Sequence, residues 1–262
     1  MNSDFQSAVS VDSYDYPPPS QWQLALCDLM KKYGHKGGNF SLDVGCGPGR
    51  FTEMLRAPLF ERAFGVDSSV NMLKRAAARS KQENVSFVAG TAERLPFPSG
   101  TFDFVLLRYL LHHLADIPKV LLEVKRVLSR SSYCVIETAN PEVLAQRPVY
   151  QQFPDIARKD LMRWPRISRI TEICFDAGLE VLGVDTFKDM RGTQSKDEYR
   201  DWLIKWEKNG GGTSFWRLFD SDERSRYAKY ELGRLDQTGE TYKRQIFTES
   251  EFLVIRPAGM QK

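Results

Sequence analysis

A glycine-rich segment in the first fifth of the chain constrains the fold most. Residues 41–50 read SLDVGCGPGR, so an apolar lead-in is followed by glycines at alternate positions, Gly45, Gly47 and Gly49. Glycine lets the backbone turn tightly and lets a ligand approach main-chain N–H groups with no side chain between. We therefore predict a strand that ends in a ligand-binding loop, followed by a helix that begins near Arg50. A tight turn without a ligand is the alternative for this segment taken alone.

Two acidic residues accompany the glycine loop. Asp43 lies two residues before Gly45, and Asp67 lies 24 positions after Asp43, at the end of the short apolar segment 64–66. In doubly wound α/β sheets, an acid at the end of the second strand binds ribose hydroxyls, roughly 20 residues past the first loop. We therefore expect Asp67 to bind a ribose. Asp67 or Ser68 is also expected to cap the helix that follows, and the two roles are compatible.

The kind of nucleoside follows from what the loop lacks. The dinucleotide fingerprint G-x-G-x-x-G needs a third glycine where this chain has Arg50, and no G-K-[ST] follows as in a P-loop. A pyrophosphate beside Asp43 is disfavoured because like charges repel, whereas a cationic ligand is favoured. S-adenosylmethionine fits this pattern, because it carries an ammonium, a sulfonium and a ribose diol.

Four segments in sequence resemble the motifs of class I S-adenosylmethionine-dependent methyltransferases. LDVGCGPG resembles the first motif, GVDSSVNML the second, GTAERLPFPSGTFDFV the third, and RYLLHHL with EVKRVL the fourth block of the small-molecule branch typified by ubiquinone and menaquinone methylation. The resemblance covers roughly residues 38–139. It implies a Rossmann-like α/β fold, a doubly wound sheet of seven mostly parallel strands with an antiparallel last strand and a helical cap insertion.

The resemblance also implies S-adenosyl-L-methionine as cofactor and S-adenosyl-L-homocysteine as product. The methionyl part is expected at Asp43 and the glycine loop, and the ribose at Asp67. Relatives often carry aspartate where this chain has Thr91, which shifts the adenine contact towards the Ala92 backbone and Glu93. The expected cofactor contacts are Asp43, Gly45, Cys46, Gly47, Gly49, Asp67, Ser68, Met72, Thr91, Ala92, Glu93 and Arg108.

The sequence says less about where the methyl acceptor binds. Residues 108–114 follow the fourth predicted strand at its carboxyl end, where open α/β sheets bind ligands, and they hold two of the three histidines. A structural role for these histidines is the alternative. Methyl transfer from a sulfonium needs mainly alignment, and a base only for a protonated nucleophile of high pKa. The candidates to assist the acceptor are His112, His113, Tyr14 and Tyr109.

Composition places few further limits on function. The chain has 262 residues, a net charge of +3 and no run of basic residues, so nucleic acid is not favoured as a partner. The four cysteines are far apart, with neither C-x-x-C nor metal-ligand spacing, so we expect free thiols, a cytoplasmic location and no metal site. We find no signal peptide and no apolar run long enough to span a membrane, and the oligomeric state stays open.

The predicted organisation has four parts. Residues 1–37 form an N-terminal arm and helix that belong to a lid, with Ser20 as the helix cap and Tyr14 and Tyr16 over the cleft; a disordered tail is the alternative. Residues 38–187 form the cofactor-binding core, with a sixth strand at 179–187. Residues 188–244 form an aromatic-rich helical cap insertion, either a satellite core or a substrate-facing cap. Residues 245–262 supply the last strand.

We therefore expect a methyltransferase that acts on an O, N or C nucleophile of a small molecule, such as a secondary metabolite. Two alternatives stay open. The first is a methyltransferase for tRNA or protein, which predicts a basic face or docking tail. The second is a cofactor-binding protein whose transfer activity is altered or lost.

Overall fold

A computed structural model describes residues 21–56, 59–210 and 214–259 of the chain. Tyr14 and Tyr16, and with them the expected N-terminal arm of the lid, lie outside these residues, as does Ser20. The first described helix has Gln21 as its N-cap, so the prediction of a cap at Ser20 was wrong. No helix among the described residues is long and apolar enough to cross a membrane.

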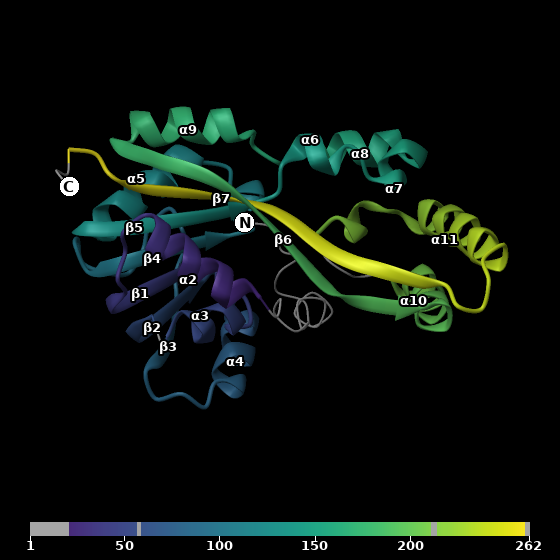
Figure 1. Cartoon of the computed structure of the whole chain (residues 1–262), viewed down its shortest axis with the longest axis horizontal. Coiled ribbons are helices and arrows are strands. Elements are labelled where there is room, and N and C mark those ends of the chain that lie inside the picture. The colour runs from purple at the N-terminus through teal and green to yellow at the C-terminus, as the bar shows by residue number, and fades with distance from the viewer. Residues whose placement is uncertain (1–20, 57–58, 211–213, 260–262) are drawn as a thin grey trace.

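The described residues form one seven-stranded sheet in the order β3-β2-β1-β4-β5-β7-β6 (Figure 1). Strands β1 to β5 pair in parallel, whereas β7 is antiparallel to both β5 and β6. This confirms the expected doubly wound fold with an antiparallel last strand. The strands are β1 (Gly38–Val44), β2 (Phe60–Asp67), β3 (Val85–Ala89), β4 (Phe102–Arg108), β5 (Leu128–Thr138), β6 (Leu179–Ser195) and β7 (Lys243–Pro257).

Helices cover both faces of the sheet (Figure 1). Those of the core are α2 (Trp22–Lys32), α3 (Arg50–Leu55), α4 (Val70–Arg79), α5 (Ile117–Val127) and α9 (Ile167–Asp176). Successive side chains of a strand point to opposite faces, so β4 places Val105 and Leu107 with α5 and α9, and Phe104 and Leu106 with α2 and α3. Both faces of β4 are therefore apolar, as expected for a central parallel strand.

The start of α4 differs from the prediction. Ser69 is the N-cap, and its hydroxyl accepts a hydrogen bond from the Met72 N–H. A cap at Asp67 or Ser68 was therefore wrong. The Asp67 carboxylate instead accepts hydrogen bonds from the N–H groups of Gly47 and Ser69, and the hydroxyl of Ser69, two residues along the chain, takes the capping position.

Strands β6 and β7 are longer than the sequence pattern predicted. Their antiparallel register continues from the sheet to the pair Ser195 and Lys243, and the two strands leave the core as a ribbon (Figure 1). The outer part of β6 reads KDMRGTQS, which lacks the alternating apolar pattern of a strand, and it pairs with β7 along its length. The ribbon ends where Ser195 and Glu198 form a capping box that starts the next helix.

A second group of helices lies along the ribbon and at its outer end (Figure 1). It comprises α10 (Lys196–Asn209) and α11 (Ser221–Asp236), together with the short helices α6 (Pro141–Leu144), α7 (Pro148–Gln152) and α8 (Pro154–Leu161) and the 3-10 turn η3 (Trp216–Leu218). These elements share a third apolar cluster, separate from the two beside the sheet. The cap core therefore combines residues 188–244 with short helices from the segment 38–187, which the sequence analysis assigned to the cofactor-binding core. Its aromatic members include Tyr150, Phe153, Tyr199, Trp206, Phe215, Phe219 and Tyr227.

Replacement of Trp206 by alanine is expected to loosen the cap and leave the sheet folded. The indole is 3% exposed and touches the rings of Trp202, Trp216 and Phe219, so its removal costs about 3–5 kcal/mol. Hydrogen-exchange mass spectrometry should show faster exchange in α10 and α11 and unchanged protection in β4. Ile204→Ala, at a half-exposed position of the same helix, is the control. Uniform loss of protection through the sheet would contradict a separate cap core.

Candidate functional site

The glycine loop after β1 has the backbone that the sequence predicted. Gly45, Gly47 and Gly49 have φ values of 72°, 53° and 80°, in the left-handed region that favours glycine. A Cβ on Gly49 would lie 2.5 Å from the ring of Phe87, so packing also requires glycine there. A Cβ on Gly47 would meet nothing within 4 Å, so the loop presents open backbone at this position.

The Asp67 carboxylate joins this loop to the end of β2. It accepts hydrogen bonds from the N–H groups of Gly47 and Ser69, both at 2.8 Å. Burial raises the pKa of Asp67, while hydrogen bonds from the Ser69, Gly47 and Ser68 backbone oppose that rise. A carboxylate offers about four acceptor positions, so the group retains capacity for further donors such as hydroxyls.

Asp43 lies beside this carboxylate at the end of β1. It is 2% exposed, and its carboxylate accepts a hydrogen bond from the Thr52 hydroxyl at 2.7 Å. Burial raises the pKa of Asp43 to about 7, and the Thr52 hydrogen bond and the charge of Arg108 limit the rise. A buried acid is most stable as an anion when a cation lies beside it, so this site favours a positively charged ligand group.

Arg108 lies in a buried polar cluster at the ends of β4 and β5. Its Nε is 2.7 Å from Glu137 Oε2, and its guanidinium lies 3.7 Å from the centre of the Phe51 ring. Glu137 also accepts hydrogen bonds from Trp22 Nε1 at 2.8 Å and Ser250 Oγ at 3.1 Å. The cluster thus connects the site to α2 and β7, and contact of Arg108 with the cofactor stays a prediction.

Sequence reasoning missed Glu137 and Trp22 as parts of this cluster. A glutamate at the end of the otherwise apolar strand YCVIET was the available sign, because a carboxylate in such a place needs a partner when buried. The partner could not be named from spacing, since Trp22 lies 115 residues away in the sequence.

The residues expected near adenine follow β3, next to Asp67. Gly90 N–H donates to the Asp67 carbonyl at 3.1 Å, and Arg94 N–H donates to the Thr91 carbonyl at 3.2 Å, which closes a short turn. Ala92 is buried within this turn. Of the remaining predicted contacts, Cys46 and Met72 are buried, Glu93 is half-buried and Ser68 is exposed.

The two histidines after β4 stack into an aromatic group. In the 3-10 turn η2 (Leu111–His113), the His112 ring lies 3.8 Å from His113 and 3.7 Å from Trp164, centre to centre, and is nearly parallel to the indole. Burial lowers the pKa of His112 well below its usual value and that of His113 to about 4, with Arg163 and Arg217 adding to the fall for His113. Both imidazoles are therefore neutral at pH 7.

Tyr109 completes this group. Its φ is 46°, an uncommon left-handed value for a residue with a side chain, and its ring lies 5.8 Å from Trp164 at a steep angle. Nearby, Asp160 pairs with Arg163 and accepts the Tyr150 hydroxyl. The structure thus brings together the described acceptor-side candidates around Trp164, which sequence reasoning missed. Tyr14 lies outside the described residues.

The residues at these strand ends fit S-adenosylmethionine. The open backbone at Gly47 admits a ligand, Asp67 retains acceptor capacity for a ribose diol, and Asp43 favours a cationic group. No group of three or more histidine, cysteine or acidic side chains suited to a metal ion occurs among the described residues.

Comparison with known proteins supports this interpretation. Residues 42–136 match the family model described as "Methyltransferase domain". Over these residues the chain is similar to methyltransferase domains. The family match runs from Leu42 within β1 to Ile136 near the end of β5, and thus includes both acids and both histidines of the site.

Curated relatives of this methyltransferase domain include two bacterial proteins. The chain is 36% identical over 116 residues to the uncharacterized methyltransferase YcgJ of Bacillus subtilis, covering 43% of this chain and 44% of that protein. It is 33% identical over 168 residues to a demethylmenaquinone methyltransferase of Lactococcus lactis, covering 62% and 63% respectively. The matches therefore span less than two thirds of the length of these relatives.

Solved structures show the same fold over most of the chain. A putative methyltransferase of Bacillus halodurans matches with a TM-score of 0.60 and 22% identity, covering 89% of this chain and 98% of that one. Haemonchus contortus phosphoethanolamine N-methyltransferase 2, in complex with S-adenosylhomocysteine, matches with a TM-score of 0.57 and 17% identity, covering 98% and 59%. At these identities the likeness supports the architecture of the methyltransferase domain.

The buried acid Asp43 gives the unliganded methyltransferase domain a characteristic pH dependence. An unfolded aspartate ionises near 3.8 and folded Asp43 at about 7, so the folded state binds an extra proton between these values. Its contribution to stability is complete below the unfolded pKa and is lost as pH rises through the folded pKa, at about 1.4 kcal/mol per pH unit in that window. Denaturant titrations from pH 4 to 8 should show this loss in the wild type and not in Asp43→Asn; identical profiles would contradict it.

Proposed function

We propose that the chain is an S-adenosylmethionine-dependent methyltransferase that transfers a methyl group by in-line displacement to an O, N or C nucleophile of a small molecule. The observation that carries the proposal is the Asp67 carboxylate, which the N–H groups of Gly47 and Ser69 hold at the ends of β1 and β2. An acid in this place at the carboxyl edge of an α/β sheet is suited to a ribose diol.

The domain's own residues bind and orient in this proposal. Asp43 attracts the cationic methionyl part, the backbone at Gly47 admits it, and Asp67 accepts the ribose hydroxyls. Residues 91–93 contact the adenine. When bound, the cofactor supplies an activated methyl group on a sulfonium with a neutral leaving group. The protein then has to align the acceptor with that methyl group and exclude water.

The acceptor binds beside Tyr109, His112 and His113 in this proposal. The neutral imidazoles can accept a hydrogen bond from a hydroxyl or amine acceptor and so orient it, and the aromatic surface of Trp164 suits a ring-bearing molecule. The positive charge of Arg217, which belongs to the cap, lowers the pKa of His113, so the cap lies close to this side of the site. This arrangement favours an acceptor small enough to be enclosed between the cap and the sheet. The name of the Lactococcus lactis relative points in the same direction. We place the activity in the cytoplasm, in keeping with four unpaired cysteines.

Replacement of Asp67 by alanine is expected to weaken binding of S-adenosylhomocysteine by about 10- to 100-fold, because hydrogen bonds to a carboxylate are worth about 1.5–3 kcal/mol. Isothermal titration calorimetry measures this directly. Asp28→Ala, which removes an exposed aspartate from α2, should bind as the wild type does. Unchanged affinity in Asp67→Ala would remove the ribose assignment.

The class of acceptor can be found by isotope transfer. The wild-type protein, incubated with methyl-13C S-adenosylmethionine and a desalted cell extract, is expected to label the small-molecule fraction, as read by mass spectrometry. Asp67→Ala should label it far more slowly. Label confined to RNA or to protein would contradict the small-molecule acceptor, and no label in any fraction from several extracts would contradict transfer activity.

A further inference from the structure

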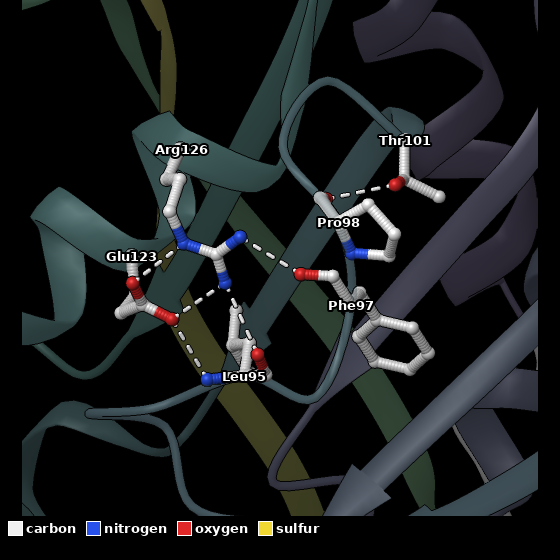
Figure 2. A network of polar contacts seen from close by, with 6 residues as sticks. All are labelled: Leu95, Phe97, Pro98, Thr101, Glu123 and Arg126. Atoms are coloured by element: carbon white, nitrogen blue, oxygen red, sulfur yellow. Dashed lines mark hydrogen bonds and ion pairs between the residues drawn. The ribbon is translucent and has the colours of Figure 1, made fainter.

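A charged pair on α5 fastens the loop that follows the adenine-side residues (Figure 2). Arg126 Nε donates to Glu123 Oε1 at 2.7 Å, and Nη2 donates to Glu123 Oε2 at 2.8 Å. The same guanidinium donates to the Phe97 carbonyl at 2.8 Å and to the Leu95 carbonyl at 3.1 Å. Glu123 Oε2 in turn accepts the Leu95 N–H at 2.8 Å, so both members of the pair hold loop backbone.

The other end of this loop is fixed to β2. Gly90 N–H donates to the Asp67 carbonyl at 3.1 Å, and a turn closed by Arg94 N–H and the Thr91 carbonyl follows. Leu95, 4% exposed, packs into the main core beyond that turn. Residues 91–93 therefore lie between two fixed points of the backbone. Gly90 is hydrogen-bonded to Asp67 at the end of β2, and Leu95 is hydrogen-bonded to Glu123 and Arg126 of α5.

The loop backbone matters more here than it would with an acid in the turn. Thr91 stands where relatives often carry an aspartate, and its hydroxyl is a weaker acceptor for the purine amino group than a carboxylate, so more of the recognition falls to backbone groups of the turn. Backbone donors and acceptors cannot reorient independently as side chains do. Their placement depends on how firmly residues 90–95 are held.

The pair is suited to positioning and less to stabilisation. The Glu123 and Arg126 side chains are 19% and 33% exposed, and an ion pair with such access to solvent contributes little stability. The planar guanidinium, however, bridges a carboxylate and two carbonyls at once, which a lysine ammonium on a flexible stem does not reproduce. Figure 2 shows the Arg126 guanidinium between Glu123 of the helix and the carbonyls of the loop.

We propose that Glu123 and Arg126 are positioning residues for the purine subsite, which hold the turn 91–93 so that its backbone selects a 6-aminopurine over a 6-oxopurine. The inference rests on the proposed function, because it assumes that a nucleoside occupies the edge beside Asp67. It assigns a share of cofactor specificity to two residues of α5.

The test compares S-adenosylhomocysteine with S-inosylhomocysteine, in which an oxo group replaces the amino group, by calorimetry well below the unfolding temperature. The wild type should prefer the amino compound. Arg126→Ala should bind S-adenosylhomocysteine about tenfold more weakly, which is equivalent to roughly one hydrogen bond. It should lose less affinity for S-inosylhomocysteine, so the ratio of the two affinities should fall. Arg126→Lys should not restore the preference, and Glu123→Gln, which keeps an oxygen acceptor for the Leu95 N–H, should narrow it less.

Arg169→Ala is the matched control, because Arg169 and Glu172 form a pair of the same spacing on the surface of α9. It should bind both nucleosides as the wild type does. If Arg126→Ala fails to fold, Arg126→Lys and Glu123→Gln carry the test alone. An unchanged preference in the folded variants, whether affinity falls for both compounds equally or for neither, would overturn the positioning role. Failure of the wild type to bind either compound would instead overturn the proposed function, and this inference with it.

Discussion

The candidate site depends on one shared carboxylate, that of Asp67. Its hydrogen bonds from Gly47 and Ser69 connect the glycine loop after β1 to the start of α4, so two loops that are separate in sequence form one edge of the site. Burial makes the charge of this group costly, and the backbone N–H groups compensate. The carboxylate retains acceptor capacity for further donors, so the group that joins the two loops is also the one that we propose binds a ribose.

Buried charges extend from this point across the carboxyl edge of the sheet. Asp43, Arg108 and Glu137 lie at the ends of three neighbouring strands. Arg108 pairs with Glu137, and its charge limits the rise that burial causes in the pKa of Asp43. Removal of one partner from such a group leaves an uncompensated buried charge, which is more damaging than loss of an exposed pair. The cluster also receives Trp22 from α2, so the helix that precedes the core is tied to the site.

Much of the fold and the backbone of the glycine loop could be predicted because local rules govern them, whereas the cofactor contacts stay predictions. The spacing of the loop glycines, Asp43 and Asp67 is set within one strand-loop-helix unit and the strand after it. The N-cap residue of α4 could not be chosen among Asp67, Ser68 and Ser69 from the sequence, because the choice depends on the hydrogen bond between Asp67 and Gly47. Trp164, Glu137 and the outer ribbon of β6 were missed for a similar reason: each is defined by a partner distant in the sequence.

A crystal structure of the wild-type protein grown with S-adenosylhomocysteine tests the central claim most directly. The account predicts both ribose hydroxyls within about 2.5–3.0 Å of the Asp67 carboxylate, which keeps its bonds to the Gly47 and Ser69 N–H groups. The amino group of the homocysteine part should lie on the Asp43 side of the loop. A nucleoside bound elsewhere, or a ribose turned away from Asp67, would contradict the account.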